Sequence, residues 1–205
     1  MLQTLSRVEV VERMTAQDFF RRATKDRKAE LIDGVMITAP PPTDQHEKLQ
    51  IFLLRLIGEY VEGFELGEVR GSRTAVKLSE DQVAEPDVLF VAKERSHIIT
   101  NEDVMGAPDL VIEVLSVSTA AYDRGAKFRA YAHAGVRELW LIDPYGPAGT
   151  EFFQRAGDLL KPTMPDGTGF IASLALPGLR LQTRWLWPQE KFIPVREALA
   201  VMRAS

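Results

Sequence analysis

Two carboxylates in apolar surroundings are the first candidates for chemistry in this sequence. Glu113 lies in the middle of the apolar residues 109–115, whose Val, Ile and Leu content predicts a buried central strand. Asp87 directly precedes a second apolar segment, residues 88–91. Acidic side chains are rarely buried unless they are paired or bound to a metal. Two of them on neighbouring buried strands could bind a divalent cation together, so the leading hypothesis is a metal-dependent hydrolase.

The position of each carboxylate in its strand suggests how the two could meet. Asp87 is expected at the start of one strand and Glu113 near the end of the next, so antiparallel pairing would bring both to one end of the sheet. A Mg²⁺ ion there would take oxygen ligands at about 2.0–2.1 Å and leave positions for water or phosphate. Such an ion activates water and stabilises charge on a phosphoryl group. Two alternatives stay open: Asp87 could cap a turn after Pro86, and Glu113 could form a buried ion pair with a basic residue.

Two basic residues on the helix expected after the Glu113 strand are further candidates. Lys127 could orient the attacking water or stabilise the charge that develops on the phosphoryl group. The alternative is an exposed helical ion pair with Asp123, four residues earlier. Arg124 could contact a substrate phosphate, or it could be a solvated arginine.

Glu30 and His46 complete the candidate set. Glu30 lies in the first half of a predicted hairpin and could be a further metal ligand or could hold Lys127; the alternative is a strand position that faces solvent. His46 begins a long predicted helix and could act as a base or substrate contact near the site. Its alternative is a polar residue in an exposed first turn. His97 and His133 form no pattern with it, and three scattered histidines do not make a zinc site.

Composition limits the classes of function. The 205 residues fit one domain with a sizeable core. The net charge of −4 argues against a strong non-specific nucleic-acid binder but does not exclude a nucleic-acid enzyme. The chain has no cysteine, which excludes disulfides, thiolate catalysis and cysteine-ligated metals. Residues 1–10 contain no continuous apolar segment, and no segment approaches the roughly 20 apolar residues of a membrane span, so we expect a cytoplasmic protein without a membrane partner.

The remaining elements must position these residues. A short helix is expected over residues 15–23 with Thr15 as N-cap, and Asp33-Gly34 predicts a hairpin turn. The apolar spacing predicts a long helix over residues 44–62, with Asp44 and Glu47 as a capping box. Further strands are expected at residues 66–70, 73–78 and 136–143, a helix at 120–134, and an antiparallel extension at 151–154, 159–163 and 169–174. A strand–helix–strand unit over residues 109–143 predicts a parallel crossover, and the whole order predicts a mixed sheet with helices packed on it.

Together these segments resemble the Uma-type endonuclease-like family, which belongs to the PD-(D/E)XK nuclease superfamily. The resemblance covers most of the chain from about residue 14 to residue 143, and the ordered set is much more specific than any one member. The matching segments are ELIDG at 30–34, the prolines before the His46 helix, EPDV at 85–88, PDLVIEVLS at 108–116, YDRGAKF at 122–128 and YAHAGVRELWLIDP at 131–144.

This resemblance implies a restriction-endonuclease-like α/β (α+β) fold. The expectation is a single domain over residues 1–205, with an αβββαβ mixed-sheet core over about 14–144 flanked by helices. An added N-terminal hairpin and a peripheral C-terminal β extension over about 145–205 would complete it. The resemblance also suggests a homodimer or higher homo-oligomer. The apolar Trp185 and Trp187 could serve such an interface, although core packing is the commoner role of such residues.

The resemblance also implies a DNA endonuclease that uses Mg²⁺ or Mn²⁺. Asp87 and Glu113 match the two acidic positions of the superfamily motif and would bind the metal, with Glu30 assisting. The motif lysine falls at position 115, where this chain has Leu115, and Lys127 would replace it from the adjacent helix.

Two other functions compete with the endonuclease. Leu115 and the acidic net charge favour a degenerate nuclease-fold module that binds nucleic acid or protein without cleavage. An unrelated small-molecule hydrolase that uses the same carboxylates is the third hypothesis.

Overall fold

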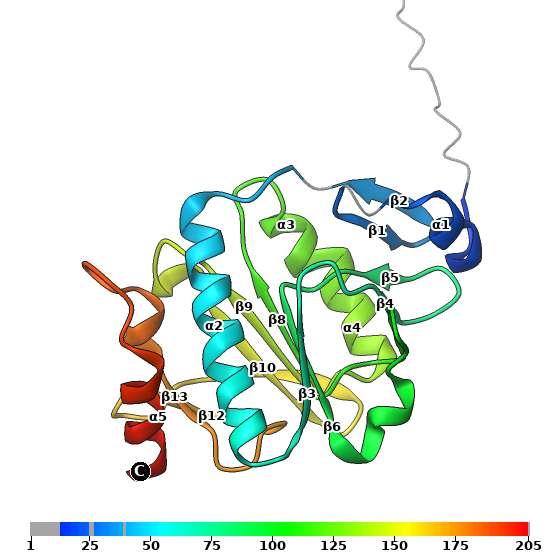
Figure 1. Ribbon diagram of the computed structural model, residues 1–205. Coiled ribbons are helices and arrows are strands. Elements are labelled where there is room, and N and C mark those ends of the chain that lie inside the picture. The colour runs from blue at the N-terminus through cyan, green and yellow to red at the C-terminus, as the bar shows by residue number, and fades with distance from the viewer. Residues whose placement is uncertain (1–12, 25–26, 39, 205) are drawn as a thin grey trace, which may run out of the picture.

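The structure, a computed structural model, describes residues 13–24, 27–38 and 40–204 (Figure 1). The expectation about residues 1–10 therefore lies outside the described residues. A mixed sheet forms the centre of the molecule. Its strands, in spatial order, are β11 (Leu159–Thr163), β10 (Glu151–Ala156), β9 (Glu138–Ile142), β8 (Leu110–Val114), β6 (Val88–Ala92) and β3 (Gly67–Gly71). Strands β8 and β9 are parallel, as the strand–helix–strand pattern predicts, and the other neighbours are antiparallel.

A second, smaller sheet lies beside the first one, and a short ribbon follows near the C-terminus. The second sheet has the order β2 (Val35–Thr38), β1 (Ala29–Ile32), β5 (Val83–Ala84), β4 (Val76–Lys77) and β7 (Val104–Met105). The ribbon pairs β12 (Phe170–Ala172) with β13 (Arg180–Gln182). The turn between β1 and β2 is Asp33-Gly34, both at positive φ, which confirms the predicted hairpin.

Helices cover both faces of the central sheet, and the segments of helix are short except for α2. The α-helices are α1 (Ala16–Arg22), α2 (Asp44–Gly63), α3 (Ala120–Tyr122), α4 (Phe128–Ala134) and α5 (Val195–Ala204). A π-helical turn, Asp123–Lys127, joins α3 to α4, and 3₁₀ turns occur at Lys93–Ile98, Pro147–Gly149 and Thr183–Leu186. None of the described helices is long and apolar enough to cross a bilayer.

The helix caps explain where α1 and α2 begin. Thr15 caps α1 as predicted, because its hydroxyl accepts from the backbone N–H of Asp18 and the Asp18 side chain returns the contact. The capping box predicted at Asp44 is wrong. Thr43 is the N-cap of α2, since its backbone is extended and its hydroxyl accepts from the backbone N–H of His46 at 3.3 Å. Asp44 instead lies in the first turn, where a negative charge is favourable near the helix N-terminus.

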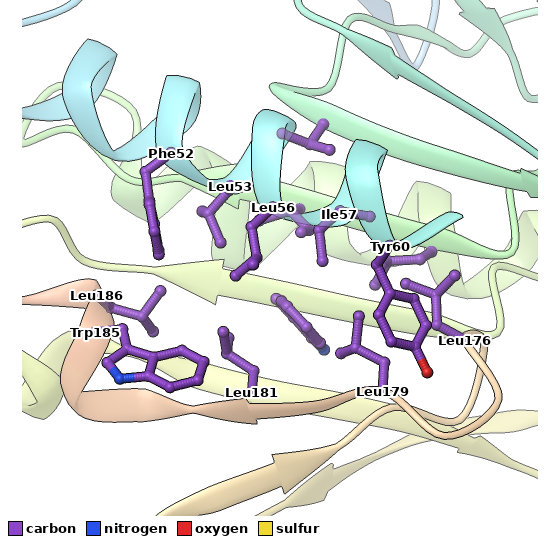
Figure 2. Close-up of a cluster of buried hydrophobic side chains, with 14 of the residues drawn as sticks. Phe52, Leu53, Leu56, Ile57, Tyr60, Leu176, Leu179, Leu181, Trp185 and Leu186 are labelled. Atoms are coloured by element: carbon purple, nitrogen blue, oxygen red, sulfur yellow. The ribbon is translucent and has the colours of Figure 1, made fainter. Parts of the chain in front are cut away.

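One side of the central sheet packs against α2, α5 and the C-terminal segment. The apolar face predicted for α2 is buried there, and Figure 2 shows its side chains pointing toward those of the C-terminal segment. The residues that meet include Leu53, Leu56, Ile57 and Tyr60 of α2 and Leu176, Leu179, Leu181, Trp185 and Leu186. Strands β10 and β11 continue the central sheet, so the segment after residue 144 contributes to the main core. Trp185 is buried in that core, and Trp187 is half-buried against it with its indole N–H donated to the Asp143 carbonyl at 2.7 Å.

The opposite side of the sheet packs against α4. Along β8, alternate side chains separate cleanly between the two sides: Leu110, Ile112 and Val114 face α2, whereas Val111 faces α4. Glu113 is two residues after Val111, so its side chain points to the same side of the strand, toward α4.

Truncating the buried face of α2 should destabilise the protein. Leu53 is fully buried and Ile51, on the same helix, is 56% exposed. We expect Leu53→Ala to lower the free energy of unfolding by about 2–5 kcal/mol, through lost burial and the cavity left behind. Ile51→Ala should change it by less than about 0.5 kcal/mol. Urea unfolding followed by circular dichroism measures both, and equal losses would contradict the described packing.

Candidate active site

The site lies where the two sheets meet. The residues between β5 of the small sheet and β6 of the central sheet are Glu85, Pro86 and Asp87. Strands β6 and β8 pair antiparallel with Val88 opposite Ile112, and the same register continued by one residue places Asp87 opposite Glu113. The two carboxylates therefore meet at one end of the sheet, as the strand order predicts.

Six charged side chains gather there, and we call them the charged cluster. They are Lys28, Glu30, Asp87, Glu113, Asp123 and Lys127. Asp87, Glu113 and Lys127 are each at most 3% exposed. Charges at this depth require close partners.

Glu113 is held by two side chains from the helix above it. Lys127 Nζ lies 2.8 Å from Glu113 Oε1, and the Tyr131 hydroxyl donates to the same oxygen at 2.5 Å. Among the described residues, no hydrogen bond or ion pair reaches the other carboxylate oxygen, Oε2. Burial raises the pKa of Glu113 to about 8, and the attraction of Lys127 opposes but does not cancel that effect.

Lys127 is enclosed by carboxylates. Its Nζ lies 2.7 Å from Glu30, 2.8 Å from Glu113 and 3.7 Å from Asp123. The alternative of an exposed pair with Asp123 is wrong, because both side chains are buried. The π-helical turn carries both residues, and π-bulges recur at functional sites. Burial lowers the pKa of Lys127, but Glu113 and Glu30 outweigh it and hold that pKa well above its usual value.

Glu30 connects the small sheet to the cluster. Its Oε1 accepts from the Glu85 backbone N–H at 2.8 Å and from Lys127, and its Oε2 accepts from the Tyr122 hydroxyl at 3.1 Å. The solvent-facing alternative for Glu30 is wrong, since the residue is 4% exposed. Both oxygens are occupied by protein donors, which favours holding Lys127 over binding a metal.

Asp87 is held by cations and by the backbone of β8. Its Oδ1 lies 2.9 Å from Lys28 Nζ, and its Oδ2 accepts from the Val114 N–H at 2.9 Å and lies 3.2 Å from His46 Nε2. Burial raises the pKa of Asp87, but Lys28 and His46 outweigh it, so the net shift is downward. His46 is buried, so the exposed alternative for it is wrong. Its Nδ1 is buried without a partner among the described residues.

Arg124 is the candidate that the structure does not bring to the charged cluster. Its Nε lies 2.6 Å from Glu151 Oε2, and its guanidinium also donates to the Gly149 carbonyl, toward β10. Asp109, the residue before β8, is also engaged elsewhere, with its Oδ1 3.0 Å from Arg95.

Three members of the site escaped the sequence analysis. Lys28 is two residues before Glu30, and this period-two spacing could have placed both on one face. Tyr131 is four residues after Lys127, which puts it on the same helical face. Tyr122 has no comparable signal, because its partner, Glu30, is 92 residues away in the sequence.

The donor set fits a divalent ion of the magnesium type. Asp87 and Glu113 supply carboxylate oxygens, which such hard cations prefer. Among the described residues, no group of three or more His, Cys, Asp or Glu side chains is placed to hold a metal ion. That is compatible with Mg²⁺, which is commonly bound through one or two carboxylates together with water and phosphate.

A mixed sheet between α2 and α4, with an aspartate and a glutamate at adjoining strand ends, is restriction-endonuclease-like architecture. A crystal structure from Anabaena variabilis, titled as a "putative nuclease belonging to DUF820", superimposes with a TM-score of 0.68 at 19% identity. The superposition covers 85% of this chain and 97% of the other, and it shows a shared fold.

The chain belongs to the Uma2 family, described as "Putative restriction endonuclease", which matches residues 16–184. Two uncharacterized Synechocystis proteins are also similar to it. The protein slr1290 is 29% identical over 63% of this chain and 68% of its own length. The protein sll1609 is 29% identical over 71% of this chain and 82% of its own length.

Removing the enclosed Lys127 should lower the free energy of unfolding far more than removing an exposed lysine. Lys127→Met leaves buried carboxylates without their cation, and we expect it to lower the free energy of unfolding by about 3–5 kcal/mol. Lys48 forms an exposed helical pair with Asp44 at 2.6 Å, and Lys48→Met should cost at most about 1 kcal/mol. Urea unfolding at pH 9, where the Glu113 carboxyl is ionised, compares the two variants. Similar small losses for both would mean that the cluster does not depend on Lys127.

Proposed function

We propose that this protein is a nuclease that hydrolyses phosphodiester bonds of DNA with Mg²⁺ or Mn²⁺. The observation that carries the proposal is the meeting of Asp87, Glu113 and Lys127 at one end of the central sheet. Membership of the family described as "Putative restriction endonuclease" supports it, as does the fold shared with the "putative nuclease" from Anabaena variabilis.

Asp87 and Glu113 would hold the metal ion in this proposal. When bound, such an ion activates water and offsets negative charge on the phosphoryl group. Oε2 of Glu113 is the oxygen available to it, since Lys127 and Tyr131 both use Oε1. His46 orients Asp87 through its contact at 3.2 Å.

Lys127 would position the attacking water and stabilise the negative charge that develops as the water oxygen adds to phosphorus. The P–O bond to the leaving sugar oxygen breaks; the attacking water releases a proton to solvent, and the leaving oxygen takes up a proton from solvent. Glu30 and Asp123 keep Lys127 in place through the contacts at 2.7 and 3.7 Å. Arg124 stays a prediction as a phosphate contact and would have to leave Glu151. A cytoplasmic location and a homo-oligomer likewise stay predictions.

A non-cleaving module on the same fold is the second candidate function, and one observation favours it. Leu115 is 3% exposed and packs in the apolar cluster on the α4 side, so the motif position supplies no cation. Lys127 is also fully engaged by carboxylates. Such a module would bind nucleic acid or protein without metal-dependent turnover.

Cleavage assays separate the two functions. We expect the wild type to nick supercoiled plasmid with Mg²⁺ or Mn²⁺. Asp87→Asn and Glu113→Gln, which keep side-chain size, should each lower the rate by about 10²–10³-fold, the scale of losing a charge-stabilising group. Asp158→Asn, in the exposed turn between β10 and β11, is the matched control and should cleave normally. Undiminished cleavage by either site variant would refute the site, and no cleavage by the wild type would favour the non-cleaving module.

Metal binding should depend on pH through Glu113. Because burial raises the pKa of this carboxyl to about 8, it is protonated at pH 6–7 and must lose a proton to bind a cation. The affinity for Mn²⁺ should therefore rise with pH by about tenfold per unit and level off above pH 8. Asp87, whose pKa is lowered, adds nothing over this range. Titration calorimetry in buffers of different ionisation enthalpy counts the released proton, and a constant affinity from pH 6 to 8 would contradict this account.

A further inference from the structure

Lys28 is the cation at the outer side of the charged cluster. It directly precedes β1, and its Nζ lies 2.9 Å from Asp87 Oδ1. Its side chain is 22% exposed, whereas Asp87 is 3% exposed and Lys127 is 2% exposed. An ion or phosphate that approaches from solvent therefore meets Lys28 before it meets Lys127.

The contact of Lys28 with Asp87 opposes the binding of another cation. Lys28 engages Oδ1, and Val114 and His46 already engage Oδ2. A divalent ion on Asp87 would have to share the carboxylate with the ammonium group, and like charges a few ångströms apart repel strongly where water is excluded. Lys28 therefore weakens metal binding as long as it stays on Asp87.

A substrate phosphate offers the ammonium group another partner. Phosphate oxygens are strong acceptors for lysine, and Lys28 has a flexible stem and partial exposure that allow it to move outward. Lys127 has no such freedom, because two carboxylates hold its Nζ within 2.8 Å and it is buried.

We propose that Lys28 couples metal binding to substrate binding: its ammonium group moves from Asp87 Oδ1 to a substrate phosphate and leaves that oxygen to the metal. This role rests on the proposed nuclease function and adds a substrate contact to it. By linkage, the metal strengthens phosphate binding by the same factor by which phosphate strengthens metal binding.

The experiment measures metal affinity without catalysis. Mn²⁺ is titrated calorimetrically into the full chain in the absence of DNA. Lys28→Met should bind Mn²⁺ about tenfold more tightly than the wild type, a coupling of ordinary size. Lys28→Arg, which keeps the positive charge, should bind Mn²⁺ with an affinity within about threefold of that of the wild type. Lys161→Met, on the exposed edge strand β11, is the control and should change nothing.

A second titration follows the substrate. Binding of a short DNA duplex is measured by fluorescence anisotropy with and without Ca²⁺, which serves as the non-cleaving ion. Ca²⁺ should tighten DNA binding by the wild type about tenfold and by Lys28→Met far less. Lys28→Gln replaces Lys28→Met if the latter does not fold, as judged by circular dichroism.

Each outcome decides a different claim. Equal or weaker Mn²⁺ binding by Lys28→Met overturns the role of Lys28 while the nuclease proposal stands on wild-type cleavage. If Lys28→Met binds Mn²⁺ more tightly but Ca²⁺ strengthens its DNA binding as much as it does for the wild type, the phosphate contact is overturned. If neither the wild type nor Lys28→Met binds Mn²⁺, the metal-dependent function fails and the coupling fails with it.

Discussion

The buried ammonium group of Lys127 is the constraint on which the site depends. An isolated charge at 2% exposure would be strongly unfavourable, and here it is offset by carboxylates from three separate parts of the chain. Glu30 comes from β1 of the small sheet, Glu113 from β8 of the central sheet and Asp123 from the π-helical turn. The ion pairs therefore fix how the small sheet, the central sheet and the helix lie relative to one another.

Such a cluster is a poor source of stability, because desolvation of each ion costs several kcal/mol and the attraction only offsets it. The stabilising free energy must come from elsewhere, and the large apolar cluster between α2, the sheet and the C-terminal segment is the evident source (Figure 2). The segment after residue 144 thus has a physical role although it contributes no residue to the charged cluster. Carboxylates also outnumber ammonium groups in the cluster, and this imbalance suits a divalent cation better than it suits a purely structural ion-pair network.

The sequence predicted those features that follow from local periodicity. The face of α2, the Asp33-Gly34 turn and the parallel β8–β9 crossover all come from patterns within one element or between neighbours. Asp87 and Glu113 stood out because a carboxylate in an apolar strand needs a partner. The depth of Lys127 could not be predicted, since regular helical spacing made it a plausible surface pair with Asp123, whereas the structure buries both residues in a π-helical turn. Lys28 was missed because its partner, Asp87, is 59 residues away and no local pattern reports that contact.

Leu115 and Lys127 both lie on the side of the central sheet that Glu113 faces. Positions 113 and 115 alternate onto the same side of β8, the side that faces α4. A lysine at 115 would approach Glu113 from within the strand, whereas Leu115 packs there as part of the apolar layer. Lys127 reaches Glu113 from the helical segment that covers this same side. The cation therefore comes from a different position in the sequence but lies on the same side of the sheet. Lys127 belongs to the π-helical turn, so the conformation of that turn decides how its ammonium group reaches Glu113 and Glu30.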